Sequence, residues 1–197
     1  MFVNTSSSRS SASTCAPCFL IERAKKLGRI ISEREVDLRP FDVESSIKRS
    51  LFLVTQAYSQ KKIDVTLSIK KQGAQVLADD LLDEVFTNIL SNSVHYTESD
   101  QVPVEIDVEE ARIEGKPGRY LKITFTDWGR GIPDSMKEEV FARYLKTAHG
   151  TGLGLSIVYA LVVERYSGEV RVMNRVEEDY AKGTRVLVWL PLAVDEK

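Results

Sequence analysis

The chain has 197 residues, of which 43% are hydrophobic and 28% charged, and its formal net charge at pH 7 is −2. This balance supplies a core for one domain but no basic surface of the kind that binds nucleic acid or an anionic membrane. No apolar run approaches the roughly 20 residues that span a bilayer. We therefore expect a cytoplasmic protein that binds no nucleic acid and has no membrane segment in this chain.

The N-terminal part differs in composition from the rest. Residues 1–18 are Ser-rich and hold few apolar residues, so we expect a disordered leader. Its two cysteines, Cys15 and Cys18, lack the further ligands that a zinc site requires. A helix is expected within 19–37, because apolar residues recur there at helical spacing. Residues 38–194 are expected to form the globular domain.

The hydrophobic pattern of the domain predicts alternating helices and strands. Apolar residues three and four apart indicate helices, and strict alternation indicates strands. The stretch EGKPGR joins two strands and predicts an antiparallel hairpin. The expected helices cover about 42–60, 80–95, 134–142 and 152–166, and the expected strands lie around 63–69, 104–108, 121–125, 170–172 and 186–190. This order predicts an α+β fold, a two-layer sandwich of a mixed β-sheet with helices on one face.

Two asparagines on the helix expected over 80–95 are the first candidate functional residues. Asn88 and Asn92 are four residues apart, so they share one face, about 6 Å from each other along the axis. An amide oxygen is a hard, neutral ligand that suits Mg²⁺ beside phosphates. Two solvent-facing asparagines on an ordinary helix would give the same spacing, so the pair alone is ambiguous.

The sequence DWGRGIP follows a predicted strand. Asp127 closes that strand, where its carboxylate can accept a hydrogen bond from the exocyclic amine of adenine. Gly129 and Gly131 allow the backbone to approach a flat ring without interference from a Cβ atom. The alternative is a glycine-rich hairpin turn, which Pro133 and the helix expected after it disfavour.

A third motif, GTGLGL, opens the helix expected over 152–166. Glycines ahead of a helix expose backbone N–H groups that can bind phosphate, and the helix dipole assists. No G-K-[ST] follows as in a P-loop, and no strand leads directly into the motif as in a dinucleotide-binding fingerprint. A glycine-rich loop by itself would be a weak indication.

Taken together and in this order, the motifs resemble those of the GHKL superfamily, specifically the histidine-kinase catalytic domain. NILSNSVHYT resembles the N box, DWGRGIP the first glycine box, VFARY the F box and GTGLGLSIV the second glycine box. KGTRVLVWLPL resembles the Gly-Thr element and the closing strand. The resemblance covers about residues 38–192 and implies the Bergerat ATP-binding fold.

The resemblance implies ATP and Mg²⁺ as cofactors and assigns roles to matching positions. Asn88 and Asn92 would hold Mg²⁺ and the phosphates, and Asp127 would select adenine. No catalytic residue is identified. The residues implied to bind ATP are Asn88, Asn92, His95, Tyr96, Asp127, Gly129, Gly131, Ile132, Tyr144, Gly150, Thr151, Gly152, Leu153, Gly154, Leu155 and Thr184.

Two departures from the family pattern lie near the expected phosphates. His95 stands where the family usually carries a basic residue, most often Lys, that contacts phosphate. Imidazole is only partly charged near neutral pH, so a weaker contact and some pH dependence are expected, unless His95 is an ordinary helix residue. The stretch between Phe141 and Gly150 is short, which implies a short ATP lid; His149 lies in it.

The largest departure concerns the phosphoacceptor. The family transfers phosphate to a histidine on a helical dimerisation hairpin, and no H-E-x-x-x-P-like sequence is present. The helix within 19–37 would be a remnant of that hairpin. The expected partners are a histidine-bearing phosphoacceptor domain, in a missing segment or on another chain, and a response regulator, with a homodimer as one assembly of the parent protein.

The expected function is to bind Mg·ATP and transfer the γ-phosphoryl group to a histidine in two-component signal transduction. A non-catalytic ATP-binding regulatory module and an anti-sigma-type protein serine kinase remain as alternatives. A gyrase-like or chaperone-like hydrolase is disfavoured, because Asn88 occupies the place of the general-base Glu in those ATPases. Glu84 lies another turn away, about 6 Å further along the axis.

Overall fold

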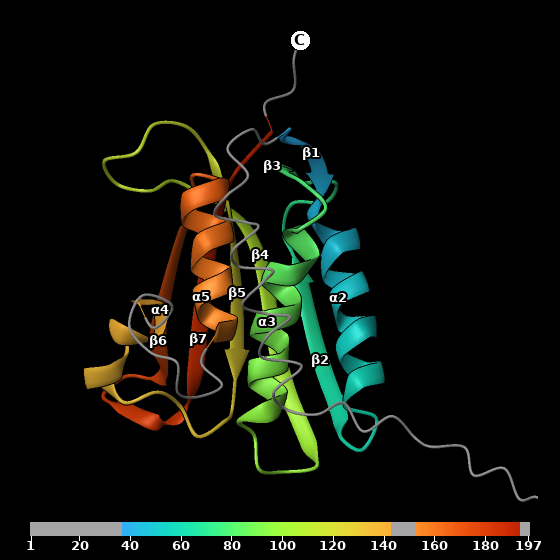
Figure 1. Ribbon diagram of the computed structural model, residues 1–197, viewed down its shortest axis with the longest axis vertical. Coiled ribbons are helices and arrows are strands. Elements are labelled where there is room, and N and C mark those ends of the chain that lie inside the picture. Colours follow the sequence, from blue (N-terminus) through green and yellow to red (C-terminus); the bar gives the residue numbers. More distant parts are fainter. Residues whose placement is uncertain (1–36, 143–152, 194–197) are drawn as a thin grey trace, which may run out of the picture.

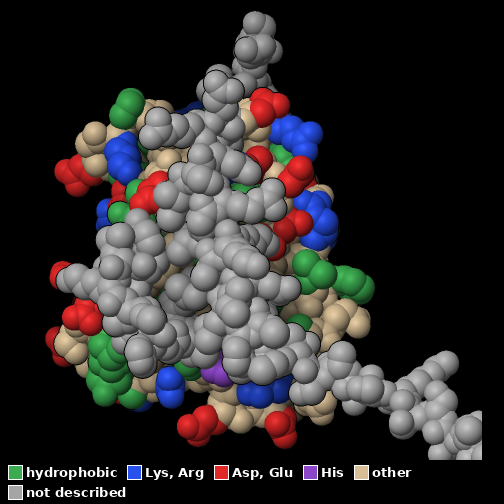
Figure 2. Space-filling view, in the orientation of Figure 1, with side chains coloured by type: hydrophobic (Ala, Val, Ile, Leu, Met, Phe, Trp, Pro, Cys, Tyr) green, Lys and Arg blue, Asp and Glu red, His purple; other side chains and the backbone are tan. Residues whose placement is uncertain are grey.

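The computed structural model describes residues 37–142 and 153–193. This part of the chain forms two layers, with helices on one face of a mixed β-sheet, as the sequence predicted (Figure 1). The helix expected within 19–37 and the two cysteines fall in 1–36, outside the described residues. On the visible part of the helical face, acidic and basic side chains are interspersed (Figure 2), in keeping with a net charge of −2.

The main sheet has five strands in the spatial order β2-β4-β5-β7-β6. β2 and β4 run parallel, and the other neighbouring pairs are antiparallel, including the β4–β5 hairpin predicted from EGKPGR. The strands are β2 (Lys62–Ile69), β4 (Gln101–Ala111), β5 (Tyr120–Asp127), β6 (Glu169–Val176) and β7 (Asp179–Pro191). A parallel pair within an antiparallel sheet is what makes the sheet mixed.

Three helices lie over this sheet (Figure 1): α2 (Val43–Ala57), α3 (Leu82–His95) and α5 (Leu153–Tyr159). Asp42 caps α2, because its carboxylate accepts a hydrogen bond of 2.7 Å from the Ser45 N–H. The apolar stripe of each helix is buried against the sheet, so burial rather than intrinsic propensity holds the helices in place.

A second, two-stranded sheet was not predicted. β1 (Arg39–Asp42) pairs antiparallel with β3 (Gln75–Ala78) at the end of the sandwich where α2 and α3 begin (Figure 1). Each strand has four residues, too few for alternation to be recognised, and Pro40 within β1 argues against a strand. β3 nevertheless contributes fully buried Val76 and Ala78 to the core.

Two predicted helices differ in detail from the structure. The helix expected over 134–142 is divided into a 3₁₀ turn, η1 (Asp134–Met136), and α4 (Glu139–Ala142). The helix expected over 152–166 is α-helical to Tyr159 and then continues as the π-helical segment η3 (Ala160–Arg165). Hydrophobic periodicity over six residues does not distinguish these helix types, because their angular spacing differs little.

The rotation of α3 is fixed by its buried face. Val85, Ile89 and Val94 are at most 1% exposed, and the rings of Phe86 and Phe125 lie 5.6 Å apart. Lys61 extends from the α2–β2 connection to the C-terminal end of α3, where its Nζ donates to the Val94 carbonyl at 3.1 Å and to the Thr97 carbonyl. With the apolar face held on the sheet, a neighbouring face of α3 is presented to α5. No helix in the described residues is long and apolar enough to cross a membrane.

Candidate functional site

A cavity of about 340 Å³ lies between the C-terminal half of α3, the loop after β5, the η1–α4 segment and the start of α5. Six of the predicted site residues line it: Asn92, Tyr96, Gly131, Ile132, Gly154 and Leu155. Much of the remaining wall is apolar. A cavity of this size with an apolar wall and a few polar groups is typical of a small-molecule site.

The two asparagines of α3 lie against the start of α5. Asn88 is 3% exposed, and its Nδ2 donates to the Glu84 carbonyl at 2.7 Å. Its Oδ1 is buried and has no hydrogen-bond partner in the described part of the chain. A Cβ atom added at Gly154 would lie 3.3 Å from Asn88 Oδ1 and from both polar side-chain atoms of Asn92. The structure therefore brings together the first and third motifs, which are some 60 residues apart in the sequence.

This contact gives a first prediction, for Gly154→Ala. The added methyl group must push the two amides aside by a few tenths of an ångström, so we expect the affinity for a Mg²⁺–nucleotide to fall about three- to tenfold. The fold should persist, because Ala favours the helix over Gly by roughly 1 kcal/mol. Titration calorimetry and a thermal melt of the same sample would check both parts. An unchanged affinity at an unchanged melting temperature would exclude a role for this contact.

Asp127 is 9% exposed at the end of β5. Its Oδ1 accepts hydrogen bonds from the Gly129 N–H at 2.9 Å and the Thr184 N–H at 3.1 Å, and Ser93 Oγ donates to Oδ2 at 3.3 Å. Burial raises the pKa of Asp127 above its ordinary value, although these three hydrogen bonds act in the opposite direction. Asp127 is thus fixed by hydrogen bonds from α3, the loop after β5 and β7, and it is not among the residues that line the cavity.

The glycines of DWGRGIP meet protein backbone. A Cβ atom at Gly129 would lie 2.9 Å from the Tyr96 carbonyl oxygen. Gly131 has a φ of +68°, and a Cβ atom there would lie 1.6 Å from the Tyr180 carbonyl oxygen, so no other residue fits without moving the β6–β7 hairpin. The structure therefore explains both glycines by close contact with protein backbone, and the approach of a flat ring at this loop stays a prediction.

Several predicted residues do not line the cavity. His95 is one of them: it is exposed, although its neighbour Tyr96 lines the cavity. Thr184 is 6% exposed and reaches the site through its N–H bond to Asp127. Leu153 begins α5, but its side chain is not described. The predicted residues Tyr144, Gly150, Thr151 and Gly152, together with His149, lie outside the described residues.

Five lining residues were not predicted: Arg130, Pro133, Met136, Val140 and Tyr180. Arg130 and Pro133 belong to the recognised DWGRGIP motif, so their positions could have been proposed from its context. Met136 and Val140 follow on the segment predicted as a helix. Tyr180 comes from the β6–β7 hairpin, and nothing in its local sequence indicates that this hairpin reaches the loop after β5.

Comparison with known proteins identifies the class. A family model described as "Histidine kinase-, DNA gyrase B-, and HSP90-like ATPase" matches residues 77–194. The chain belongs to this family of ATPase domains, and the predicted GHKL resemblance is confirmed. The family name combines kinases and ATPases, so the particular members that the chain resembles narrow the class further.

Those members are sensor histidine kinases. ZraS of Escherichia coli O157:H7 is 29% identical over 187 residues, which cover 90% of this chain but 38% of ZraS. Among solved structures, the mycobacterial sensor histidine kinase MprB is 29% identical with a TM-score of 0.61, covering 79% of this chain and 98% of that one. Full-length ShkA in complex with AMPPNP shares the fold, with a TM-score of 0.69 at 22% identity, covering 89% of this chain and 36% of that one. The chain thus spans under two-fifths of the length of ZraS and is similar to the catalytic domains of sensor histidine kinases.

Proposed function

We propose that this chain binds Mg·ATP in the cavity beside α3 and supplies the γ-phosphoryl group to a histidine in two-component signalling. The observation that carries the proposal is the buried, unpartnered Oδ1 of Asn88, which lies with Asn92 against the start of α5. A buried acceptor without a donor costs stability, and such groups in native structures are explained by a missing ion, water or ligand.

A magnesium ion suits this position. Amide oxygens are hard ligands, and Mg²⁺ is typically bound by few protein groups together with substrate phosphates and water. In the described residues, no group of three or more His, Cys, Asp or Glu side chains could hold a metal ion. Asn88 and Asn92, whose side-chain amides meet beside Gly154, are the residues proposed to hold Mg²⁺, and the ion would neutralise charge on the phosphates.

The same arrangement suggests how the rest of the nucleotide lies. Backbone N–H groups at the start of α5, where Gly154 lies against the two amides, would bind the phosphates, whose negative charge the helix dipole favours. Asp127 is proposed to accept a hydrogen bond from the adenine amine, and the apolar wall formed by Ile132 and Leu155 would contact the base or ribose. Apart from His95, which does not line the cavity, the remaining residues of the predicted ATP-binding set keep the roles proposed for them from the sequence.

Transfer, rather than hydrolysis, is the reaction that the residues support best. Asn88 has no basic atom that could take a proton from water, and its Nδ2 already donates to the Glu84 carbonyl. In transfer, the bond between the γ-phosphorus and the bridging oxygen breaks, ADP leaves, and an N–P bond forms with the acceptor imidazole. Positioning and charge neutralisation suffice for this step. A histidine-bearing acceptor domain and a response regulator are the proposed partners.

The experiment that tests this function incubates the chain with Mg·ATP labelled in the γ-phosphoryl group. A histidine-bearing dimerisation hairpin of a sensor histidine kinase is supplied in trans, and the same hairpin with its histidine replaced by glutamine is the control. We expect acid-labile label on the first hairpin only, and no release of phosphate by the chain alone above background. Acid-stable label would favour the serine-kinase alternative, and steady phosphate release without an acceptor would indicate a hydrolase.

A further inference from the structure

We propose that Arg130 is the cation, among the described residues that line the cavity, that contacts the phosphates of the nucleotide, and that Tyr96 holds it there. This proposal rests on the proposed function, since it assigns a further residue to the same ATP site. It transfers to Arg130 the contact that the family pattern led us to expect from His95.

Charge is the first observation. Of the described residues that line the cavity, Arg130 alone carries a formal charge. The structure records no ion pair for Arg130 among the described residues, whereas most other arginines of the domain have a carboxylate partner. A guanidinium group is always protonated and presents several N–H donors, which suits phosphate oxygens.

The position of Arg130 is fixed by α3. Its backbone N–H donates to the Tyr96 carbonyl at 3.1 Å, and its guanidinium lies 4.7 Å from the centre of the Tyr96 ring. The Tyr96 N–H in turn donates to the Asn92 carbonyl at 2.9 Å at the end of α3. Tyr96, which contacts Arg130, is one helical turn, about 5–6 Å along the axis, beyond Asn92, so Arg130 is attached to the end of α3 just past a residue proposed to hold Mg²⁺ and the phosphates.

His95 has a different environment. It is exposed, it does not line the cavity, and its ring meets the Tyr96 ring edge to face, with centroids 4.8 Å apart at 81°. The Tyr96 ring is thus in contact with both side chains, with the His95 ring nearly perpendicular to it and the Arg130 guanidinium over its face. Stacking on the ring reduces the freedom that the arginine would lose on meeting a ligand, because cation–π contact pre-orients the guanidinium.

The test compares Arg130→Gln, His95→Gln and the wild-type chain by calorimetric titration with Mg·AMP-PNP and with adenosine, at 50 and 300 mM NaCl. Arg112→Gln, an exposed cation on the distant β4–β5 hairpin, is the matched control. For Arg130→Gln we expect an affinity for Mg·AMP-PNP about five- to twentyfold lower at 50 mM salt, because an exposed charge-assisted contact is lost. Adenosine affinity should change less than about twofold, and the salt dependence of nucleotide binding should become shallower.

Each result decides between assignments. An Arg130→Gln variant that binds Mg·AMP-PNP as tightly as the wild type would overturn the proposal. Equal losses of affinity for adenosine and for Mg·AMP-PNP would also overturn it, because they would indicate that the cavity has changed shape and not that a contact with the phosphates is lost. A larger loss in His95→Gln than in Arg130→Gln would return the contact to His95 and overturn it as well. A folded wild-type chain that binds neither ligand would refute the proposed function itself. That result differs from a failure of the Arg130 assignment, in which the wild type still binds Mg·AMP-PNP. Arg130→Lys should recover part of the salt dependence, because it keeps the charge but loses the planar stacking.

Discussion

Replacing Asp127 by asparagine is expected to weaken ATP binding by about 1–3 kcal/mol, roughly five- to 150-fold, while leaving the fold intact. The adenine amine loses a charged acceptor and meets an amide in its place. The backbone donors Gly129 and Thr184 keep their acceptor, because the retained Oδ1 atom receives both bonds. Ser93 Oγ, which also lies 3.3 Å from the Ile89 carbonyl, can accept from the new amide group.

The stability of this variant should equal or exceed that of the wild type at neutral pH. Burial raises the pKa of Asp127, so the folded state binds a proton more readily than the unfolded state does. Such a group costs stability above its folded pKa, and the cost disappears as the pH falls through that pKa. Asp127→Asn removes the cost at all pH values. Chemical denaturation of the nucleotide-free protein at several pH values measures this directly.

The matched control is Asp64→Asn, which alters a carboxylate on β2 that is about half exposed. It should change neither nucleotide affinity nor stability by more than about 0.5 kcal/mol. If Asp127→Asn binds ATP as tightly as the wild type does, the adenine assignment is wrong. If the variant unfolds, Asp127 is chiefly a structural residue that joins β5 to β7.

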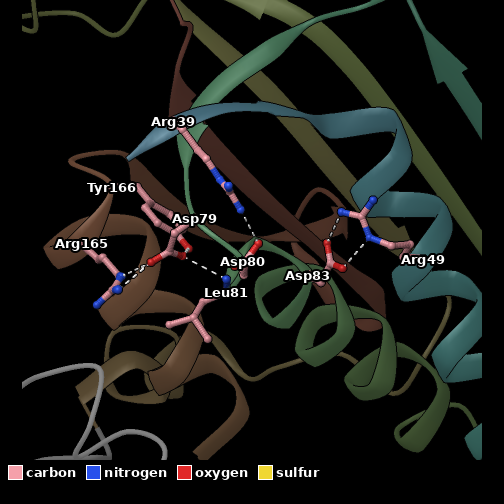
Figure 3. A network of polar contacts seen from close by, with 8 residues as sticks. All are labelled: Arg39, Arg49, Asp79, Asp80, Leu81, Asp83, Arg165 and Tyr166. Atoms are coloured by element: carbon pink, nitrogen blue, oxygen red, sulfur yellow. Dashed lines mark hydrogen bonds and ion pairs between the residues drawn. The ribbon is translucent and has the colours of Figure 1, made fainter. Parts of the chain in front are cut away.

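Replacing Asp79 by alanine is expected to lower the free energy of unfolding by about 2–4 kcal/mol. Asp79 joins the start of α3 to the end of η3 (Figure 3). It accepts from Arg165 Nε and Nη2 at 2.7 and 2.6 Å, from the Tyr166 hydroxyl at 2.6 Å and from the Leu81 N–H at 3.0 Å. The Arg165 side chain is 8% exposed and Tyr166 is 1% exposed, so these bonds lie in a region that water replaces poorly.

The neighbouring residue provides a control within the same network. Asp80 pairs with Arg39 at 2.9 Å, but the two side chains are 85% and 60% exposed (Figure 3). Asp80→Ala should therefore cost less than about 0.5–1 kcal/mol. Equal losses of unfolding free energy from the two substitutions would show that the buried pair contributes no more than the exposed one. That result would contradict the role of Asp79 in joining α3 to η3.

The hydrogen bonds to Asp79 also make the stability of the protein depend on pH in the acid range. Burial acts to raise the pKa of Asp79, but the hydrogen bonds from Tyr166, Leu81 and Arg165 outweigh it, and the pKa lies below its ordinary value of 3.8. The stabilisation is therefore complete above about pH 4–5 and is lost as the pH falls through the folded pKa. The wild type should lose more stability between pH 5 and pH 3 than Asp79→Ala does, as urea titrations at the two pH values would show.

The sequence predicted those parts of the fold where local pattern and tertiary packing agree. α2, α3 and the five main strands have long apolar stripes, and burial on the sheet requires those same stripes. β1 and β3 were missed because four residues carry too little periodicity, and the π-helical η3 because its spacing resembles that of an α-helix. Asp79 was not singled out, since its partners Arg165 and Tyr166 are more than 80 residues away.

In the candidate site too, residues within local motifs were predicted and residues brought in by tertiary contacts were not. Asn92, Gly131 and Gly154, which line the cavity, were predicted because the proposed ATP site uses short motifs whose residues are close in sequence. Tyr180 and Met136 complete the cavity through tertiary contacts that no motif records. His95 was assigned from its position in a motif, and the structure leaves it outside the cavity wall.

The most direct test of the central claim, that Asn88 and Asn92 hold Mg·ATP against the start of α5, is calorimetric titration of this chain with AMP-PNP in the presence and absence of Mg²⁺. We predict binding between micromolar and millimolar strength, about −8 to −4 kcal/mol, with Mg²⁺ present, and clearly weaker binding after its removal by chelation. A folded chain that binds AMP-PNP equally well with and without Mg²⁺, or that does not bind it, would contradict the claim.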